Sequence, residues 1–553
     1  MISSGRSRTR SAVVALALAA LTVAGSVSVV TRTTDAQAAV GPLASAVEDE
    51  GADCAVSGLP DLGSLPTNAK LPDPFKKLNG TTISSKSDWR CRRAEIKELA
   101  EKFVFGDKPA KPATVTGTVS SSTVTVNVSH NGRSSSFSAR VELPSGTGPF
   151  PAVVVVGGFG ADTATIKAAG AAVISYDPLA VGREGTPRNN KQGAFYSIYG
   201  SSSSTGLLAA WGWGVSRIID VVEQSDGRIL RADVMGVTGC SRYGKGAFAI
   251  GVFDQRIALT MPIESGSAGV PIFRGIPGEG AQSLSSAYGE QPWLGDAFGS
   301  FTGSPNRLPV DTHEMVAMVA PRGLFIMDNP HIANLGPRSA SVAALGGAEV
   351  YRALGAGDNI TYWSDVQDGS HCANRPEWRT PLQNNIRKFL LETGNEPGVI
   401  RISSRALGRL ADWRDWPTPV LADGPTTPPP TSPPPTTPPP TTPPPTTPLP
   451  TTPPPTGAGC AATVSVNQWT GGFVATVRVT AGAAPVNGWT VGMTLPSGAS
   501  ITSIWGANRS GSTGAVQFTN VAYNGSIAAG QSTEFGYQGS GTGTGMVPTC
   551  SAA

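Results

Sequence analysis

The pattern of hydrophobic and polar positions divides the chain into two differently built regions. Before residue 424, wholly apolar runs such as Ala-Val-Val-Val-Val at 152–156 alternate with longer segments of helical character. The predicted strands are 152–156, 171–176, 233–238, 259–263, 323–327 and 360–364, and the predicted helices are 205–224, 247–253, 338–354 and 380–392. Apolar strands separated by helices predict a mostly parallel sheet covered by helices on both faces.

A hairpin is predicted ahead of this sheet. Residues 123–128 (Thr-Val-Thr-Val-Asn-Val) and 136–143 (Ser-Phe-Ser-Ala-Arg-Val-Glu-Leu) alternate with period two. His130-Asn131-Gly132 lies between them, and Asn-Gly is a strong hairpin-turn signal.

The region after residue 457 has the pattern of an all-β domain. Residues 475–480 and 488–495 alternate in the manner of strands, with Gly, Asn and Ser turns at short intervals. This pattern predicts a small β-sandwich. The intervening residues 424–456 are nearly all Thr and Pro, cannot bury a core, and in polyproline II form would span about 100 Å.

The N-terminus has the layout of a secretory signal. Arg6, Arg8 and Arg10 precede an apolar run at 12–30, and Ala-Gln-Ala at 36–38 provides small residues for cleavage. We therefore predict a signal peptide at 1–38, a catalytic domain at 39–423, a linker at 424–456 and a module at 457–553. The mature protein is expected to be extracellular, without a membrane anchor.

The amino-acid composition narrows the classes of molecule that the protein is expected to bind. The chain has 553 residues, a formal net charge of +3, six Cys and four His. The nearly neutral charge gives no electrostatic footprint for nucleic acid. Six Cys in an exported chain without a Cys-x-x-Cys spacing indicate disulfides instead of a metal site. We expect no metal, no cofactor and a monomer.

Candidate chemistry begins at residues 239–245, Gly-Cys-Ser-Arg-Tyr-Gly-Lys. They stand between a predicted strand and a predicted helix, and a serine at such a turn is how an α/β-hydrolase exposes its nucleophile. Ser241 is therefore the predicted nucleophile. The order of strands and helices also resembles that of the α/β-hydrolase fold.

A nucleophilic serine needs a base, and His371 is the predicted one. It lies in Asp-Gly-Ser-His-Cys at 368–372, just past a strand near the end of the domain, where this fold carries its base. His130 belongs to the hairpin turn, and we expect His313 and His331 to be structural.

The cysteines then pair by position. Cys240 precedes Ser241 and Cys372 follows His371, so a disulfide between them would tie the nucleophile loop to the base loop. Cys460 and Cys550 are the only cysteines after the linker and are expected to pair. The remaining Cys54 and Cys91 would attach the N-terminal extension to the helix that follows Trp89.

Two acids could orient His371. Asp328 follows the strand at 323–327, the ordinary position for the acid in this fold, whereas Glu264 follows the preceding strand at 259–263. Both come after the serine and before the histidine, so chain order does not distinguish them.

Gly-Cys-Ser-Arg-x-Gly-Lys, Glu264 and the Ser-His-Cys base loop together resemble the glucuronoyl esterases of carbohydrate esterase family 15. The resemblance covers most of residues 85–395, including Leu-Pro-Val-Asp-Thr-His at 308–313 and Ala-Pro-Arg-Gly-Leu at 320–324. In that family the acid follows the earlier strand, so the resemblance favours Glu264 over Asp328.

The resemblance also implies roles for neighbouring residues. The backbone N–H and guanidinium of Arg242 would stabilise the tetrahedral oxyanion. Lys245, one turn beyond Ser241, would contact hydroxyls of a glucuronate ring, and Gln282 and Glu290 would contribute further sugar contacts. Asn334 stands where the family commonly has Trp, a departure that bears on substrate preference more than on the reaction.

Residues 460–550 resemble the family 2 carbohydrate-binding modules. Cysteines lie near both ends, and Trp469, Trp505 and Tyr523 match the family's exposed aromatic positions. Flat aromatic side chains on one sheet face can stack on successive sugar rings. Trp489 matches the buried tryptophan of the family, and Tyr523 stands where Trp is usual.

These features predict a secreted serine esterase. By resemblance it cleaves esters between 4-O-methyl-glucuronic acid on xylan and lignin alcohols, while its module binds cellulose or xylan. One alternative is another xylan-active esterase, such as an acetyl-xylan esterase. The other is a non-catalytic wall-binding protein, against which the complete set of Ser241, His371 and an acid argues.

Overall fold

The computed structural model describes residues 47–423, 459–469, 471–521 and 524–552. The chain forms two compact units, Met1–Thr431 and Ser432–Ala553. The predicted signal peptide at 1–38 and linker at 424–456 lie outside the described residues. Within the described part, no helix combines the length and apolar character that crossing a bilayer requires.

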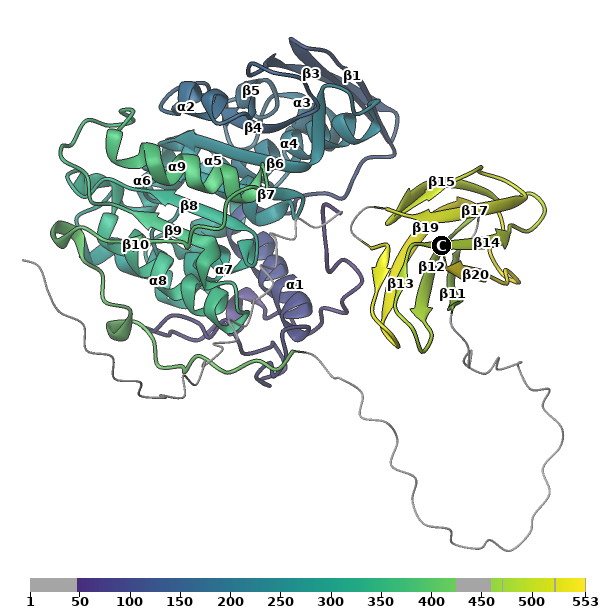
Figure 1. Cartoon of the computed structure of the whole chain (residues 1–553). Helices are drawn as coiled ribbons and strands as arrows, with labels where there is room; N and C mark the ends of the chain where they lie inside the picture. Colours follow the sequence, from purple (N-terminus) through teal and green to yellow (C-terminus); the bar gives the residue numbers. More distant parts are fainter. Residues whose placement is uncertain (1–46, 424–458, 470, 522–523, 553) are drawn as a thin grey trace, which may run out of the picture. The chain divides into compact units, whose positions relative to one another are not determined.

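The first unit is built on a mixed sheet, with strand order β1-β2-β3-β5-β4-β6-β7-β8-β9-β10 in the described residues (Figure 1). The strands are β1 (Thr114–Val119), β2 (Thr123–His130), β3 (Arg133–Glu142), β4 (Phe150–Val156), β5 (Ala172–Tyr176), β6 (Leu230–Cys240), β7 (Ile257–Ile263), β8 (Gly323–Met327), β9 (Ile360–Trp363) and β10 (Ile400–Arg401). Pairing is antiparallel from β1 to β5 and parallel from β5 to β10. The predicted parallel sheet and α/β-hydrolase architecture are confirmed.

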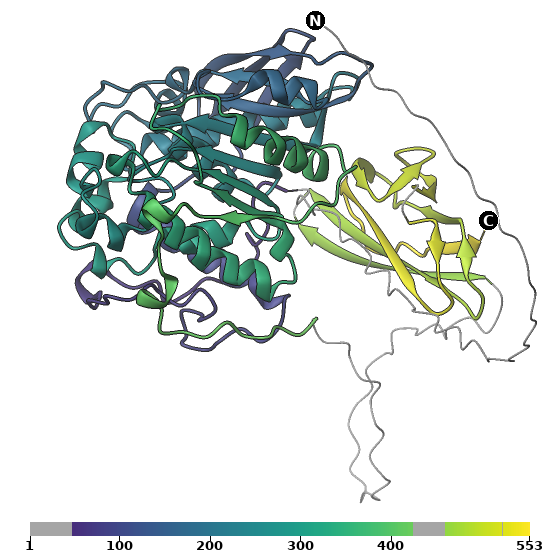
Figure 2. The same ribbon diagram turned by 60° about the vertical axis from the view of Figure 1, so that its left-hand side comes forward.

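Helices cover both faces of this sheet (Figures 1 and 2). They are α1 (Asp88–Ala100), α2 (Thr163–Ala168), α3 (Ala194–Tyr199), α4 (Leu207–Gln224), α5 (Arg242–Phe253), α6 (Leu284–Glu290), α7 (Thr312–Val319), α8 (Pro337–Ala353) and α9 (Pro376–Phe389). Along β4, Val154 packs in the core formed with α4, α5, α7 and α8, whereas Val153 packs in the core formed with α2 and α9. Burial on both faces explains why this strand is apolar at every position.

The hairpin has the predicted turn. β2 and β3 pair with His130 opposite Arg133. Asn131 and Gly132 between them have φ of 49° and 74°, the left-handed values that a two-residue hairpin turn requires. Strand β1 adds to the edge of this hairpin and was not predicted, because its Gly117 weakens the strand pattern.

The second unit is a β-sandwich, as predicted. Its strands are β11 (Cys460–Trp469), β12 (Gly472–Ala481), β13 (Val486–Asn487), β14 (Trp489–Thr494), β15 (Ser500–Trp505), β16 (Ala507–Arg509), β17 (Ala515–Asn520), β18 (Ser526–Ile527), β19 (Ser532–Ser540) and β20 (Thr549–Ala552). In the described residues, one four-stranded sheet has the order β11-β12-β19-β15, a second has the order β16-β17-β14-β20, and β13 pairs with β18 in a small two-stranded sheet. Trp489 is 1% exposed, stacks on Phe535 and donates through Nε1 to the Asn524 carbonyl, so its predicted core position is confirmed.

All three predicted disulfides are present. Cys54 bonds Cys91 on α1, Cys240 bonds Cys372, and Cys460 bonds Cys550. The first attaches the N-terminal extension to the catalytic unit.

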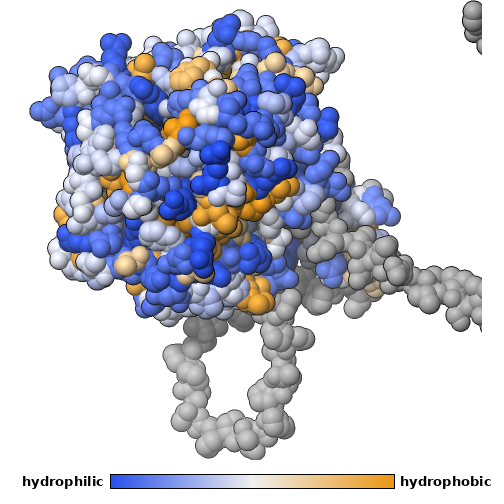
Figure 3. Space-filling view, turned by 90° about the vertical axis from the view of Figure 1, so that its left-hand side faces the viewer, coloured by the Kyte–Doolittle hydropathy of each residue, from blue (hydrophilic) through white to orange (hydrophobic). Residues whose placement is uncertain are grey.

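One face of the catalytic unit is mostly polar. On the face shown in Figure 3, hydrophilic side chains cover most of the area, and hydrophobic residues form smaller patches between them. Such a surface is ordinary for a domain in water, where isolated apolar residues are common.

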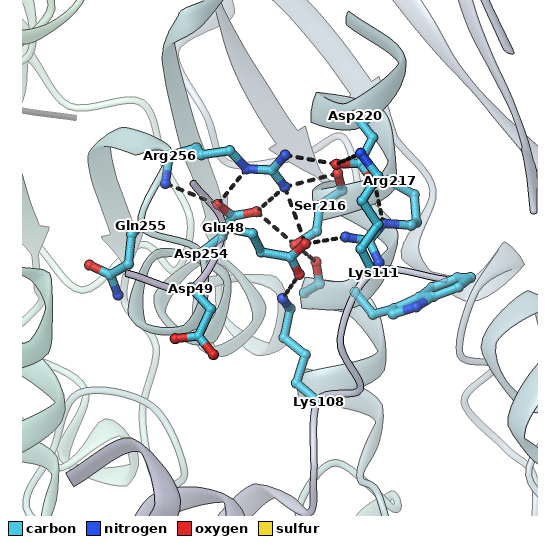
Figure 4. A network of polar contacts seen from close by, with 12 residues as sticks. Glu48, Asp49, Lys108, Lys111, Ser216, Arg217, Asp220, Asp254, Gln255 and Arg256 are labelled. Atoms are coloured by element: carbon cyan, nitrogen blue, oxygen red, sulfur yellow. Dashed lines mark hydrogen bonds and ion pairs between the residues drawn. The ribbon is translucent and has the colours of Figure 1, made fainter. Parts of the chain in front are cut away.

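A buried charge network anchors the start of the described chain (Figure 4). The Glu48 carboxylate accepts hydrogen bonds from Lys108 and Arg217 and lies 3.6 Å from the Arg256 guanidinium. The Glu48 carbonyl also accepts the Gln255 backbone N–H at 2.9 Å. Burial would raise the pKa of Glu48, but the neighbouring cations outweigh it and hold this pKa below its usual range.

We predict that Glu48→Gln destabilises the catalytic unit by about 3 kcal/mol, because it removes the carboxylate that pairs with buried Lys108 and leaves buried Arg217 with Asp220 as its remaining ion-pair partner. The change in the free energy of unfolding of the catalytic unit is measured by thermal or denaturant unfolding. Asp49→Asn is the matched control: Asp49 is 35% exposed where it contacts Lys97, and its loss should cost less than about 1 kcal/mol. Equal stability of the two variants would contradict the anchoring role of Glu48.

Candidate active site

The nucleophile turn joins β6 to α5. Ser241 has φ of 60° and ψ of −126°, a strained backbone conformation that points to a functional constraint. Its glycine neighbours permit the sharp turn. A Cβ on Gly239 would lie 2.6 Å from the Tyr243 carbonyl oxygen, and one on Gly244 would lie 2.4 Å from the Ile263 carbonyl oxygen.

His371 is held by Glu264. Its Nδ1 lies 2.5 Å from Glu264 Oε2, and the same oxygen accepts the Cys372 backbone N–H at 2.8 Å. The other carboxylate oxygen accepts from Asn329 Nδ2 at 3.1 Å and lies 3.7 Å from Arg375 Nε. A carboxylate with no exposed surface needs such partners, and a carboxylate on Nδ1 leaves Nε2 as the ring nitrogen that can accept a proton.

Asp328 occupies a different environment. Its carboxylate accepts hydrogen bonds from Tyr362 Oη at 3.1 Å and from the Asn329 backbone N–H at 2.9 Å. Burial, assisted by the charge of Glu264, raises the pKa of Asp328 to about 7. Among the contacts of the described residues, Asp328 has none with His371, so the geometry favours Glu264 as the orienting acid.

Ser241 and His371 border one cavity of about 280 Å³. Its walls are formed by Ser241, Arg242, Lys245, Gly266, Gln282, Glu290, Trp293, Ile332, Asn334, Leu335 and His371. The structure thus brings together the predicted nucleophile, base and sugar-contacting residues, and places Asn334 on the same wall.

The cavity wall carries polar groups that can form hydrogen bonds with substrate hydroxyls. Gln282 donates to Glu290 Oε2 at 2.7 Å, and Lys245 Nζ donates to the Ser265 carbonyl at 2.5 Å. Burial lowers the pKa of Lys245 to about 7, with Glu290 opposing the shift and Arg242 adding to it. Sites that hydrogen-bond a substrate hydroxyl discriminate more sharply than apolar pockets.

Two further residues, Glu184 and Trp293, lie beside the cationic side chains of Arg242 and Lys245. Sequence reasoning missed both of them. Glu184 accepts from Trp293 Nε1 at 2.6 Å through one oxygen and from Arg242 at 3.2 Å through the other. The Trp293 ring also lies 5.9 Å from the Arg242 guanidinium and 5.4 Å from Lys245 Nζ. Glu184 lies in a loop without periodicity, so no sequence signal marks it.

Arg242 is well placed for charge stabilisation. It is the first residue of α5, so its backbone N–H has no acceptor within the helix. Its side chain is 41% exposed and borders the cavity. Both donors are therefore available beside the serine.

The remaining histidines have structural contacts, as expected. Buried His313 has Nε2 2.9 Å from the Pro72 carbonyl oxygen and stacks on Trp416, and burial lowers its pKa to about 4. His331 Nε2 lies 2.9 Å from the Val366 carbonyl oxygen.

Metal binding at the base is disfavoured by the donor chemistry. Cys240, Glu264, His371 and Cys372 form a group with metal-ligand atoms close together in the described residues. Both sulfur atoms belong to a disulfide, so neither is a thiolate, and only one carboxylate and one imidazole remain.

The aromatic positions of the second unit are only partly described. Trp469 and Trp505 lie on β11 and β15, but their side chains, like all of Tyr523, are outside the described residues. Trp469 pairs with Gly472 and through it with Ser540, and Trp505 pairs with Gly536, four residues from Ser540 on β19. Because paired residues share a face and side chains alternate along a strand, the two tryptophan positions belong to one face of this sheet.

Known proteins resemble both units. Residues 126–355 match the family described as glucuronyl esterase, fungi, and residues 460–552 match the cellulose binding domain family. The 4-O-methyl-glucuronoyl methylesterase of Hypocrea jecorina is 38% identical over 379 residues, which cover 67% of this chain and 80% of that protein.

Solved structures agree with these matches. The glucuronoyl esterase catalytic domain from Hypocrea jecorina is 36% identical, with a TM-score of 0.62, over 66% of this chain and 100% of that one. A glucuronoyl esterase variant from Sporotrichum thermophile, in complex with methyl 4-O-methyl-beta-D-glucopyranuronate, is 34% identical, with a TM-score of 0.63, over 67% of this chain and 100% of that one. The chain therefore belongs to the glucuronoyl esterase family and carries a C-terminal cellulose-binding domain of family 2.

Proposed function

We propose that this esterase is a secreted serine hydrolase that cleaves 4-O-methyl-glucuronoyl esters between glucuronoxylan and lignin alcohols. One observation carries the proposal: Ser241 and the Glu264-bound His371 share a cavity with Lys245, Gln282 and Glu290. The similar protein from Sporotrichum thermophile, crystallised with a methyl glucuronate, supports a uronate on the acyl side.

The reaction follows from the positions of these groups. Ser241 Oγ attacks the ester carbonyl while His371 Nε2 takes its proton, and Glu264 stabilises the imidazolium. The oxyanion of the tetrahedral intermediate accepts from the Arg242 N–H and guanidinium. The C–O bond to the alcohol then breaks, and the alcohol leaves with the proton from His371.

A water molecule completes the cycle. It gives a proton to His371 as its oxygen attacks the acyl carbon. The bond between the acyl carbon and Ser241 Oγ then breaks, His371 returns the proton to Oγ, and the glucuronic acid is released. Lys245, Gln282 and Glu290 would hold the sugar hydroxyls throughout, so the acyl carbon stays in line with the serine.

Secretion and domain layout form part of the proposal. The signal peptide at 1–38 would be removed, and three disulfides suit an oxidising compartment. The linker at 424–456 would join a catalytic domain at 39–423 to a module at 457–553 that binds cellulose. Xylan is a second candidate ligand for the module.

Ser241→Ala should lower kcat on a methyl or benzyl glucuronate ester by at least about 10³-fold, because no other group can form the acyl-enzyme. Ester hydrolysis is followed by titration of released acid. Ser285→Ala, on the exposed side of α6, is the control and should retain wild-type activity. Hydrolysis of acetylated xylan with no action on glucuronate esters would replace the proposal with an acetyl-xylan esterase.

Glu264→Gln should lower kcat by about 10³- to 10⁴-fold, because a neutral amide no longer stabilises the His371 imidazolium. Asp328→Asn is the matched control: the amide oxygen can keep the Asn329 backbone N–H, the amide NH₂ can donate to Tyr362 Oη, and activity should stay within a few-fold of wild type. The opposite order of effects in steady-state kinetics would assign the acid to Asp328.

The Asp328→Asn variant should also differ from wild type in how its stability depends on pH. The raised pKa of Asp328 means that the folded protein resists its ionisation, so wild-type stability falls as pH rises from about 4 to about 7. Asp328→Asn lacks this cost and should be more stable than wild type by up to about 4 kcal/mol at pH 8. The two should converge near pH 4, as measured by denaturant unfolding.

Trp469→Ala with Trp505→Ala should weaken binding to microcrystalline cellulose by about 10-fold or more, because flat rings supply most of the contact with sugar faces. Hydrolysis of a small soluble ester should stay unchanged. Gln517→Ala is the control, since Gln517 is exposed on β17, in the other sheet of the sandwich. Equal pull-down of the double variant and wild type would remove the aromatic positions from cellulose binding.

A further inference from the structure

A second, more open cleft lies on the catalytic unit. It encloses about 570 Å³. Its walls are formed by Ala69, Lys70, Arg338, Ser404, Arg405, Leu407, Arg409, Asp412 and Trp413. Four of these side chains are cationic and one is anionic, so the cleft has an excess of positive charge.

Most of this charge is not neutralised. The Arg338 and Arg405 side chains are exposed, and neither has a hydrogen bond or ion pair in the described part of the chain. Arg409 Nε lies 3.7 Å from Asp412 Oδ2, with side chains 74% and 58% exposed. Lys70 Nζ donates to the Asp412 backbone carbonyl, which carries no full charge.

The Glu279 carboxylate, which contacts the start of α8, is already used in hydrogen bonds. Glu279 accepts the backbone N–H groups of Arg338 and Ser339 and the Ser339 hydroxyl, and so caps α8. Its two oxygens are used by the helix N-terminus. The Arg338 guanidinium therefore remains available to an external anion.

The cleft lies at the same edge of the sheet as the active site. Ser241 follows β6 and Glu264 follows β7, and Arg338 stands in the first turn of α8, which comes after β8. The carboxyl ends of parallel strands meet at one edge. The segment that leads into α8 also borders both cavities: Asn334, just before the helix, lines the active site, and Arg338, in its first turn, lines the cleft.

The cleft also offers surface for a sugar ring. Trp413 is half-buried in its wall, and Leu407 is 55% exposed. An aromatic side chain beside guanidinium groups combines a flat apolar contact with carboxylate recognition, which arginine provides through paired N–H donors.

We propose that this cleft binds a free uronic acid carboxylate on the polysaccharide whose esterified residue occupies the active site. The identity of the polymer rests on the proposed function. Hydrolysis turns each neutral ester into a carboxylate, and a glucuronoxylan carries unesterified carboxylates as well. A cationic cleft at the edge that holds the serine would retain such a polymer while successive esters are presented to Ser241.

The binding test compares full-length proteins on one soluble glucuronoxylan in two forms, with free carboxylates or with these reduced to neutral alcohols. Arg338→Gln with Arg405→Gln should weaken binding of the charged polymer about 3- to 10-fold at low salt. The difference should shrink at 0.5 M NaCl, where the Debye length is on the order of 4 Å. Binding of the reduced polymer, including any contribution of the module, should be unchanged.

Arg140→Gln with Arg387→Gln is the charge-matched control. Both residues are exposed and neither lines the cleft. This pair should bind both polymers as wild type does. An equal loss in the control, or an equal loss on the neutral polymer, would overturn a carboxylate site in the cleft, and so would unchanged binding of the charged polymer by the cleft variant.

Kinetics separate the cleft from the catalytic proposal. On partially methyl-esterified glucuronoxylan, the cleft variant should lose about 3- to 10-fold in kcat/KM through KM, while kcat/KM on a small methyl glucuronate stays at the wild-type value. An equal loss on the small ester would overturn the proposal by placing the arginines in the catalytic site. Absence of wild-type hydrolysis of glucuronate esters would instead refute the proposed function, while the binding comparison would still decide the cleft.

Discussion

The contact between the Glu264 carboxylate and the His371 ring is the interaction on which the rest of the site depends. The carboxylate is wholly buried, and a buried charge is tolerated only when its lone pairs are occupied. Asn329 from the end of β8, and Cys372 and Arg375 from the base loop, supply the other contacts. One acid therefore holds together segments that are more than 100 residues apart in the chain.

The disulfide between Cys240 and Cys372 constrains the same site through a covalent bond. It joins the residue before the nucleophile to the residue after the base. Ser241, Glu264 and Cys372 all have positive φ, between 45° and 60°. Backbone strain of this kind persists only where surrounding contacts over-determine it. The covalent link and the buried acid together supply that constraint.

The proposed function divides recognition between two scales. At the ester it relies on Arg242 and Lys245, beside which Glu184 and Trp293 lie. At the scale of the polymer it assigns recognition to exposed surfaces and to the separate β-sandwich. The β-sandwich buries Trp489 in a core of its own. Its outer sheet face is therefore not needed for that core, and the proposed function assigns it to contact with a flat ligand.

Local patterns in the sequence predicted most of the elements, the nucleophile turn and the base loop, because each depends on residues close together in the chain. The three disulfides join cysteines 37, 132 and 90 residues apart, and their pairing was predicted from the cysteines' places beside Ser241 and His371 and on either side of the linker. The choice between Glu264 and Asp328 was different. Both follow neighbouring parallel strands, and only the resemblance favoured one before the tertiary structure placed Glu264 against His371 and Asp328 against Tyr362. The support of Arg242 by Glu184 and the cleft around Arg338 had no sequence signal at all. They arise where distant loops meet at the carboxyl edge of the sheet, and only the packing of the whole domain brings such loops together.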